Sequence, residues 1–289
     1  MSILIIGGDS RLSKRILENY EIKYSTSRSL DQKDKLFLDL SEINSFEIPK
    51  DVDKCLIIGG PVSYAQANRD SKSVRYIHEF QIPLLVKKLL EKNIYTIYVS
   101  SNMVLGKYCN DRSEGAKPQP NIEHGKIKYL CEKEIYKKAA EVGNMDKLAI
   151  FRITKNISPE TSPFSNWIIN YKNDESIIAF KDLYLSPISY EKSAEALMRL
   201  ANLEYSGIFH FSGLNDINYF ELCCEVNKVL LETGKKQLKI ICSTSREQGV
   251  NIEDIGSTTL LDMTKTSSIL KINPVSLREI CKYIVNLLN

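Results

Sequence analysis

The sequence predicts an α/β fold in which a doubly wound parallel sheet carries a smaller C-terminal α/β lobe. Over residues 1–153, short apolar runs alternate with segments of helical periodicity. Most of these runs end in Gly, Ser or Asn, as expected for buried parallel strands that end at turns. After residue 153 the alternation loosens. We therefore expect a first domain at 1–153 and a mainly substrate-binding lobe at 154–289, some segments of which return to the first domain.

The apolar runs give the order of the elements. The first run, at 3–6, leads through a glycine turn into a helix, which is the opening of a βαβ unit. The further strands expected in the first domain lie at residues 21–26, 36–38, 54–58, 94–99 and 148–152. The further helices expected there lie at 72–92 and 124–142. For the lobe we expect helices at 190–203, 217–232 and 275–288, and strands at 207–211 and 238–242.

Composition limits the functions to be considered. The 289 residues are 43% hydrophobic and 26% charged, which is ordinary for a globular protein. The net charge of +3 comes from interspersed Lys and Glu, so we expect no nucleic-acid binding. No run is long enough to span a membrane, and no secretory signal is evident. The seven cysteines lack C-x-x-C spacing, which favours a reducing cytoplasm, and we predict no metal site.

The first turn carries a partial nucleotide-binding signal. Gly7 ends the first strand, where a glycine allows a tight turn and a close backbone approach to a phosphate. The other two glycines of a G-x-x-G-x-x-G pattern are replaced by Ser10 and Ser13. The second strand ends near Arg28 rather than at an acid, which favours a 2′-phosphate and hence NADP, with NAD as a possibility. The alternative is that Arg28 belongs to a solvated turn.

Four passages together resemble one known family, the dTDP-4-dehydrorhamnose reductase branch of the extended short-chain dehydrogenases/reductases. The resemblance covers nearly the whole chain, and its order and spacing are more specific than any one passage. The passages are ILIIG at 3–7 with Leu12, YVSSNMVL at 98–105, PNIEHGKIK at 120–128 with Glu132, and GIFHFSG at 207–213. Ser186-Pro187-Ile188 and LDMTK at 261–265 add to them.

The resemblance implies a catalytic group of a hydroxyl, a Tyr and a Lys in a Y-x-x-x-K pair. Ser101 matches the hydroxyl and Lys128 the Lys, but His124 stands in place of the Tyr. A spacing of four places His124 and Lys128 on one helix face, and an imidazole can protonate an oxyanion near neutral pH. Tyr108 and Tyr129 lie close in sequence, but Tyr129 would point away from the Lys128 face.

The resemblance also implies an NADP-binding set, with NAD possible. The residues expected to hold the dinucleotide are Gly7, Ser10, Arg11, Leu12, Arg28, Asp39, Leu40, Gly59, Gly60, Ser100 and Lys128.

Four other residues have simpler interpretations. We expect His78 at the surface or an interface, and His210 packed within its strand rather than on a metal. Glu132 lies four residues after Lys128 and would support the helix through an ion pair. Trp167 would stack on a base or sugar, or, as we favour, anchor the core.

Two functions remain open. One is an NAD(P)H-dependent reductase or epimerase acting on a 4-keto nucleotide-sugar; Asn102 and Met103 offer no acidic base beside Ser101, which disfavours dehydration. The other is a catalytically silent nucleotide-binding or regulatory subunit, because Ser10, Ser13 and His124 all replace functional positions. Apolar helix faces at 76–90 and 126–140 would suit a homodimer.

Overall fold

A seven-stranded parallel sheet forms the centre of the protein, in a computed structural model that describes residues 2–60, 71–250 and 253–288. Its strand order is β3-β2-β1-β4-β5-β6-β11. The strands are β1 (Ile3–Ile6), β2 (Tyr24–Ser27), β3 (Leu36–Phe37), β4 (Lys54–Ile57), β5 (Tyr95–Ser101), β6 (Leu148–Ile153) and β11 (Gly207–Phe211). The order reverses between β1 and β4, where a doubly wound sheet opens a ligand crevice at its carboxyl edge.

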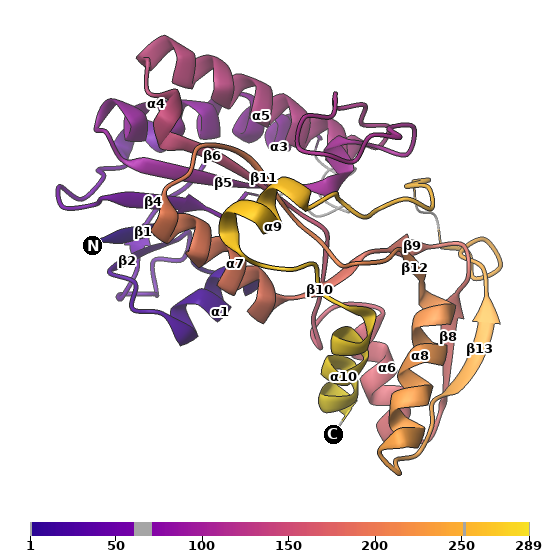
Figure 1. Cartoon of the computed structure of the whole chain (residues 1–289). Helices are drawn as coiled ribbons and strands as arrows, with labels where there is room; N and C mark the ends of the chain where they lie inside the picture. Colours follow the sequence, from indigo (N-terminus) through magenta and orange to yellow (C-terminus); the bar gives the residue numbers. More distant parts are fainter. Residues whose placement is uncertain (1, 61–70, 251–252, 289) are drawn as a thin grey trace.

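Helices cover both faces of this sheet, as the doubly wound prediction requires (Figure 1). One face carries α3 (Ser71–Tyr76), α4 (Ile82–Glu91) and α5 (Glu123–Val142), and the other carries α1 (Arg11–Asn19) and α7 (Tyr190–Leu203). A π-helical turn at Ile77–Gln81 joins α3 to α4, so the helix expected at 72–92 is continuous in direction. Short 3₁₀ turns lie at Ile43–Ser45, Asn102–Val104 and Met145–Lys147.

The C-terminal lobe stands beside the carboxyl edge of the sheet (Figure 1). Its helices are α6 (Phe164–Lys172), α8 (Tyr219–Glu232) and α10 (Leu277–Leu288), beside the parallel pair β8 (Ser176–Phe180) and β13 (Lys239–Ser243). Two further pairs connect the parts: β7 (Lys155–Ile157) with β10 (Pro187–Ser189), and β9 (Tyr184–Leu185) with β12 (Ile217–Asn218). Strand β11 and helices α7 and α9 (Thr264–Leu270) pack with the large sheet although they follow residue 153.

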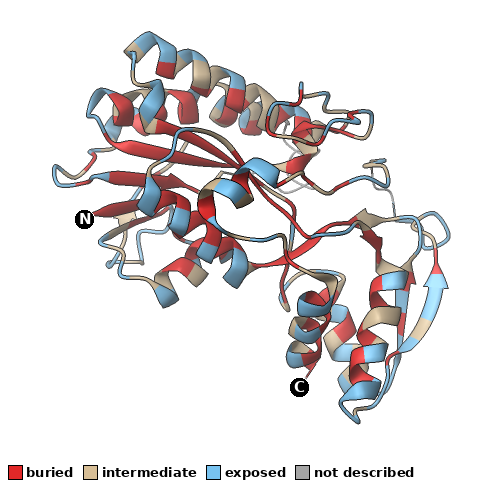
Figure 2. Ribbon diagram, viewed as in Figure 1, coloured by how far each residue is buried: buried red, intermediate tan, exposed pale blue. Residues whose placement is uncertain are grey.

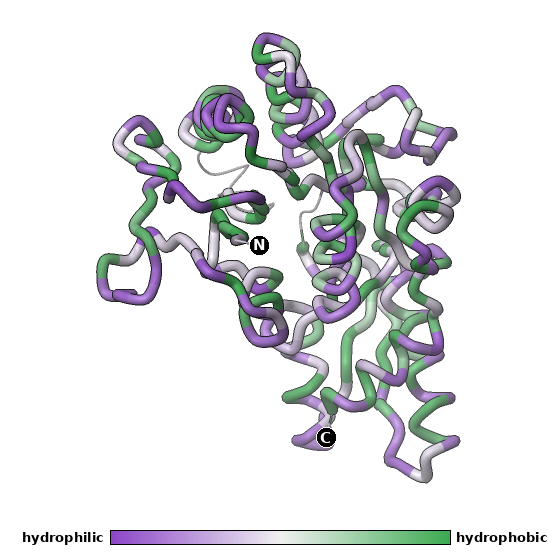
Figure 3. The backbone as a smooth tube through the Cα atoms, turned by 60° about the vertical axis from the view of Figure 1, so that its left-hand side comes forward, coloured by the Kyte–Doolittle hydropathy of each residue, from purple (hydrophilic) through white to green (hydrophobic). Residues whose placement is uncertain are grey.

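The sheet supplies most of the core. Apart from the edge strand β3, its strands are largely buried, whereas the outer helix surfaces and β13 are exposed (Figure 2). Hydrophobic and hydrophilic residues alternate along the helices (Figure 3), so each helix turns one apolar side inward. No helix in the described part of the chain is long and apolar enough to cross a membrane.

The apolar faces expected to form a dimer are used within one chain. Ile82, Leu85 and Leu89 of α4 are fully buried, as are Ile127 and Ile135 of α5. Helices α4 and α5 pack against each other. Their apolar residues are therefore accounted for without a second copy, and a homodimer stays a prediction.

His78 corrects one expectation. It is fully buried rather than at the surface, and its Nδ1 lies 3.4 Å from the hydroxyl of Tyr98. The prediction failed because α5 packs over this part of the helix, a contact between segments far apart in the sequence. His210, in contrast, is packed in β11 as expected, with its Nδ1 3.0 Å from the carbonyl oxygen of Asp262.

Candidate active site

A cleft of about 630 Å³ opens at the carboxyl edge of the sheet, and we name it the inner cleft. Its walls come from the start of α1, the ends of β5 and β6, and the first turns of α5 and α7. Six of the predicted dinucleotide residues line it: Ser10, Arg11, Leu12, Gly60, Ser100 and Lys128. The three predicted catalytic residues, Ser101, His124 and Lys128, line it as well.

Gly7 and Gly59 lie behind the inner cleft, where β1 and β4 end. Gly7 has a φ of +86°, and a Cβ built on it would lie 2.3 Å from the Cα of Gly59. A Cβ on Gly59 would in turn lie 2.6 Å from the Cα of Gly7. The two strand ends therefore need glycine on both sides, for conformation and for close approach.

The two serines that replace glycines form a local hydrogen-bond network. Ser10 caps α1 by accepting from the N–H of Ser13 at 3.1 Å. The hydroxyl of Ser13, fully buried, donates to the carbonyl of Gly7 at 2.8 Å and lies 2.8 Å from the hydroxyl of Ser10. The serines thus keep the turn tight, and the N–H groups of Arg11 and Leu12 precede the helical ladder and are available to an anion.

Three of the predicted dinucleotide residues do not line the inner cleft in the part of the chain that the structure describes. They are Arg28, Asp39 and Leu40. The Arg28 side chain is 80% exposed, and its Nε lies 3.2 Å from a carboxylate oxygen of Asp39. Hydrogen bonds from Ser41, and secondarily the charge of Arg28, lower the pKa of Asp39. A 2′-phosphate at Arg28 would have to compete with this carboxylate.

The turn after β5 and the start of α5 are packed tightly together. The hydroxyl of Ser101 accepts from the N–H of Met103 at 3.2 Å, which caps the 3₁₀ turn. A Cβ on Gly125 would lie 2.2 Å from the carbonyl oxygen of Met103, so glycine lets the helix approach this turn. This contact places the start of α5 against the turn after Ser101, and Ser101, His124 and Lys128 all line the inner cleft.

Lys128 is held by two oxygens of β5. Its Nζ donates to the hydroxyl of Tyr98 and to the carbonyl of Val99, each at 3.1 Å. Burial lowers the pKa of Lys128, while Cys131 and Glu132 oppose that shift. The ammonium is therefore fixed in orientation at the edge of the inner cleft.

His124 lies one helical turn before Lys128. Burial, followed by the charges of Lys128 and Lys155, lowers the pKa of His124 to about 3. The imidazole is therefore neutral at neutral pH. A neutral imidazole can polarise a carbonyl through an N–H group, as is known for an isomerase histidine, but it is a much weaker proton donor than an imidazolium.

Neither nearby tyrosine replaces the missing phenol. Tyr129 packs beside Val104 and Leu105, away from the inner cleft, as its helix position predicted. The Tyr108 ring is exposed and lies beneath the ammonium of Lys107.

Glu132 corrects another expectation, because its partner is not Lys128. It forms a two-point ion pair with Arg152 of β6, with distances of 3.0 and 2.7 Å, and both side chains are almost fully buried. It also accepts from the hydroxyl of Ser100 at 2.5 Å. The carboxylate thus joins α5 to β5 and β6 directly beneath the Ser101 turn.

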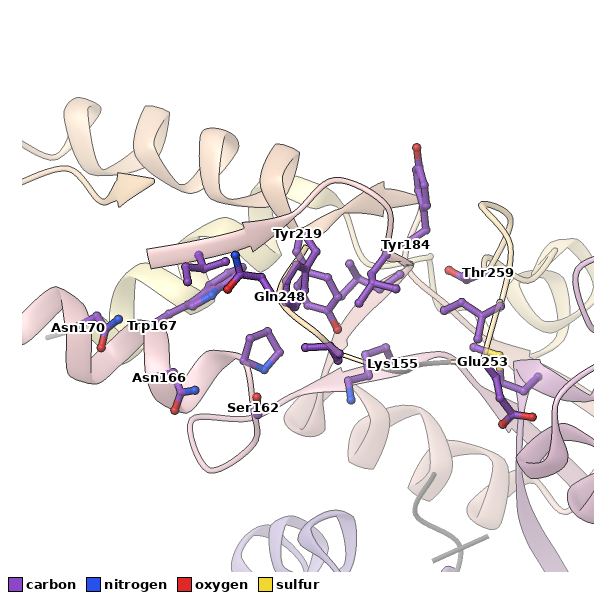
Figure 4. Close-up of a pocket in the computed structure, with 18 of the residues that line it drawn as sticks. Lys155, Ser162, Asn166, Trp167, Asn170, Tyr184, Tyr219, Gln248, Glu253 and Thr259 are labelled. Atoms are coloured by element: carbon purple, nitrogen blue, oxygen red, sulfur yellow. The ribbon is translucent and has the colours of Figure 1, made fainter. Parts of the chain in front are cut away.

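A second hollow of about 730 Å³, named the lobe pocket, adjoins the inner cleft. The two share Asn102, Met103 and Lys155. Figure 4 shows Lys155 between the α6 side chains on one side and Glu253 and Thr259 on the other. The two hollows therefore border each other at these three residues.

The chain matches one protein-family model, the RmlD substrate binding domain, over residues 1–288. It belongs to the RmlD substrate binding domain family. No curated protein sequence matches the chain.

Solved structures show the same fold for this RmlD-family chain. A dTDP-4-dehydrorhamnose reductase from Clostridium acetobutylicum is 16% identical, with a TM-score of 0.78 and 100% of both chains covered. That of Bacillus anthracis, in complex with NADP, is 17% identical, with a TM-score of 0.79 and 99% of each chain covered. UDP-glucuronic acid 4-epimerase from Bacillus cereus, with UDP-glucuronic acid and NAD, is 14% identical, with a TM-score of 0.76 and 100% and 99% covered.

Sequence reasoning missed several residues that line the inner cleft. Among them are Thr154, Lys155, Asn156, Glu160 and Tyr190. The available signal was the position of Lys155 just after β6, because ligands bind beyond the carboxyl ends of parallel strands.

Trp167 belongs to the core, as favoured, and also lines the lobe pocket. Its side chain is 2% exposed and packs edge-on against Phe164 and Tyr219, with ring centroids 5.0 and 6.0 Å away.

Proposed function

We propose that the protein is an NADPH-dependent reductase, or an epimerase, that acts on a 4-keto nucleotide-sugar. The observation that carries the proposal is the adjacency of the two hollows. The inner cleft is lined by Ser101, His124 and Lys128 beside a helix N-terminus, and it shares Asn102, Met103 and Lys155 with the lobe pocket. A dinucleotide in the first hollow and a sugar in the second would meet at these residues.

The inner cleft has the donors that a dinucleotide needs. The first turn of α1 offers N–H groups for a pyrophosphate, and Arg11 adds a cation. The residues that follow β6, Thr154 and Lys155, line the cleft opposite this turn of α1. Fold relatives crystallised with NADP or NAD support the same assignment.

A reduced dinucleotide would supply the hydride for the carbonyl carbon of the substrate. Ser101 would orient the carbonyl through its hydroxyl, and Lys128 would bind ribose hydroxyls while held by β5. The neutral His124 would polarise the carbonyl oxygen through an N–H group. Hydride addition leaves an alkoxide on the sugar. This alkoxide would receive its proton from another group of the site or from water, because imidazolium is scarce at neutral pH.

One observation favours the second candidate, a catalytically silent nucleotide-binding subunit. His124 has a pKa of about 3 where the family pattern has a phenol, so the chain lacks an efficient proton donor at that position. Such a subunit would bind a dinucleotide and a nucleotide-sugar without turnover.

A calorimetric titration with NADPH and NADH, repeated on Lys128→Ala, tests the proposal first. We expect micromolar NADPH binding that the variant weakens at least tenfold, and consumption of NADPH with a 4-keto nucleotide-sugar. Binding without turnover would select the silent subunit. If neither dinucleotide binds, redox chemistry is excluded.

Three further assignments belong to the proposal: NADP rather than NAD as cofactor, a cytoplasmic location and a homodimer. Light scattering checks the last, and a monomeric mass would remove it.

A further inference from the structure

Lys155 is singular among the charged residues of the lobe pocket. Of the described residues that line this pocket, it is the one cation, and Glu253 is the one carboxylate. The rest of the lining consists of apolar, aromatic, amide and hydroxyl side chains. A nucleotide-sugar carries two charges on its diphosphate, and burying an anion without a cation is costly. Among the described residues of its wall, Lys155 is the one that can offset that charge.

The carboxylates around Lys155 are engaged elsewhere. Glu160 pairs with Arg11 at 3.0 Å, and Glu253 accepts from the backbone N–H of Glu123 at the start of α5 at 3.1 Å. Within residues 2–60, 71–250 and 253–288, the ammonium of Lys155 makes no hydrogen bond or ion pair. Lys155 is exposed to the solvent of the two hollows, and desolvation by the surrounding walls, followed by the charge of Arg11, lowers its pKa. An anion bound at this ammonium would stabilise its charged form and so oppose the lowering of its pKa.

The far side of the lobe pocket is formed by Trp167 of α6, away from Lys155 (Figure 4). Trp167 is 2% exposed, and its indole N–H has no acceptor among the residues described. A ligand that spans the pocket would therefore contact a cation at one end and this aromatic wall at the other.

We propose that Lys155 is the anchor for the diphosphate of the nucleotide-sugar, placed where the lobe pocket meets the inner cleft. This inference rests on the proposed function and extends it to the recognition of the substrate's charge. The dinucleotide also carries a pyrophosphate, and Lys155 borders its cleft too. The dinucleotide has a cation and a helix N-terminus of its own at Arg11, so we assign Lys155 to the nucleotide-sugar.

The test compares Lys155→Met, which removes the charge but keeps the chain length, with Lys155→Arg, which keeps the charge. Lys172→Met is the matched control, because Lys172 is an exposed lysine of the same lobe outside both hollows. The titrants are dTDP, UDP, thymidine, uridine and NADPH, followed by calorimetry. We expect Lys155→Met to weaken the better nucleoside diphosphate at least tenfold, with the nucleosides and NADPH changed less than twofold. Lys155→Arg and Lys172→Met should stay within threefold of wild type.

The possible outcomes distinguish a failure of the Lys155 anchor from a failure of the proposed function. If wild type binds a nucleoside diphosphate and Lys155→Met binds it equally well, the anchor is refuted and the proposed function stands. If NADPH alone weakens, Lys155 serves the dinucleotide, and the anchor is again refuted. If nucleosides and NADPH weaken together with the diphosphate, the role is structural. If wild type binds neither dTDP nor UDP, the proposed substrate class fails together with the anchor.

Discussion

Lowering the pH should destabilise this protein through its histidines. All three histidines of the chain, His78, His124 and His210, have lowered pKa values in the folded state, and burial is the largest cause for each. The pKa is about 3 for His124 and for His210, and well below the ordinary value for His78. In the unfolded chain these residues bind protons near pH 6.5. The stability that their neutral forms contribute is therefore present above about pH 6.5 and is lost as the pH falls toward 3.

The size of the effect follows from proton linkage. Between about pH 7 and pH 5, each histidine that protonates only in the unfolded chain lowers the free energy of unfolding by about 2 kcal/mol. Three such groups give an upper limit of about 6 kcal/mol, which is comparable to the whole stability of many domains, about 5–15 kcal/mol. We expect most of this loss in the free energy of unfolding to be measurable.

Urea denaturation of the apo-protein at a series of pH values measures the loss. His210→Gln is the informative variant, because an amide can still reach the Asp262 carbonyl that His210 contacts at 3.0 Å, but it does not titrate. We expect the loss between the two pH values to shrink by about 2 kcal/mol in this variant. If wild type loses less than about 1 kcal/mol, or His210→Gln loses as much as wild type, the reasoning is wrong.

Four further predictions address the site. His124→Tyr, which restores a phenol protonated at neutral pH, should raise kcat for NADPH oxidation about tenfold or more with NADPH affinity unchanged, and a slower variant would contradict this. Glu132→Met should cost about 3–5 kcal/mol in urea denaturation because Arg152 stays buried and unpaired, whereas the double methionine variant should cost clearly less. Gly7→Ala should abolish dinucleotide binding in calorimetry and lower stability by several kcal/mol, since its φ of +86° is strained for alanine and the Cβ would collide with the backbone. Arg28→Ala should weaken NADPH more than NADH, and an equal loss for both would show that Arg28 belongs to a solvated turn.

Most of the fold could be predicted from the sequence because its helices and strands follow from local patterns of residues. Apolar runs that end in turn residues marked the strands, and the helix at 124–142 was placed within one residue of α5. Helical spacing also placed His124 and Lys128 together at the inner cleft. These properties follow from the periodicity of neighbouring residues, so a single sequence contains them.

The errors concern contacts between distant segments. Glu132 has a lysine four residues away, and a local rule chose that partner. The structure instead brings in Arg152, 20 residues later, because β6 lies beside β5 beneath the helix. His78 was expected at the surface or an interface for the same reason, since helical spacing does not reveal which other helix will cover it. Lys155 follows β6 closely, which indicates the carboxyl edge of the sheet, but its sequence neighbourhood does not show that two hollows meet there.

The departures from the family pattern are therefore unequal in consequence. Ser10 and Ser13 replace glycines, yet the Ser13 hydroxyl returns a hydrogen bond to Gly7 and Ser10 caps the helix. These two changes leave the turn, the helix N-terminus and the cleft intact, so they are weak grounds for a loss of dinucleotide binding. His124 is different, because its lowered pKa removes the charged form that would donate a proton. The choice between an enzyme and a silent subunit thus depends on one side chain on α5, and measuring turnover separately from binding decides it.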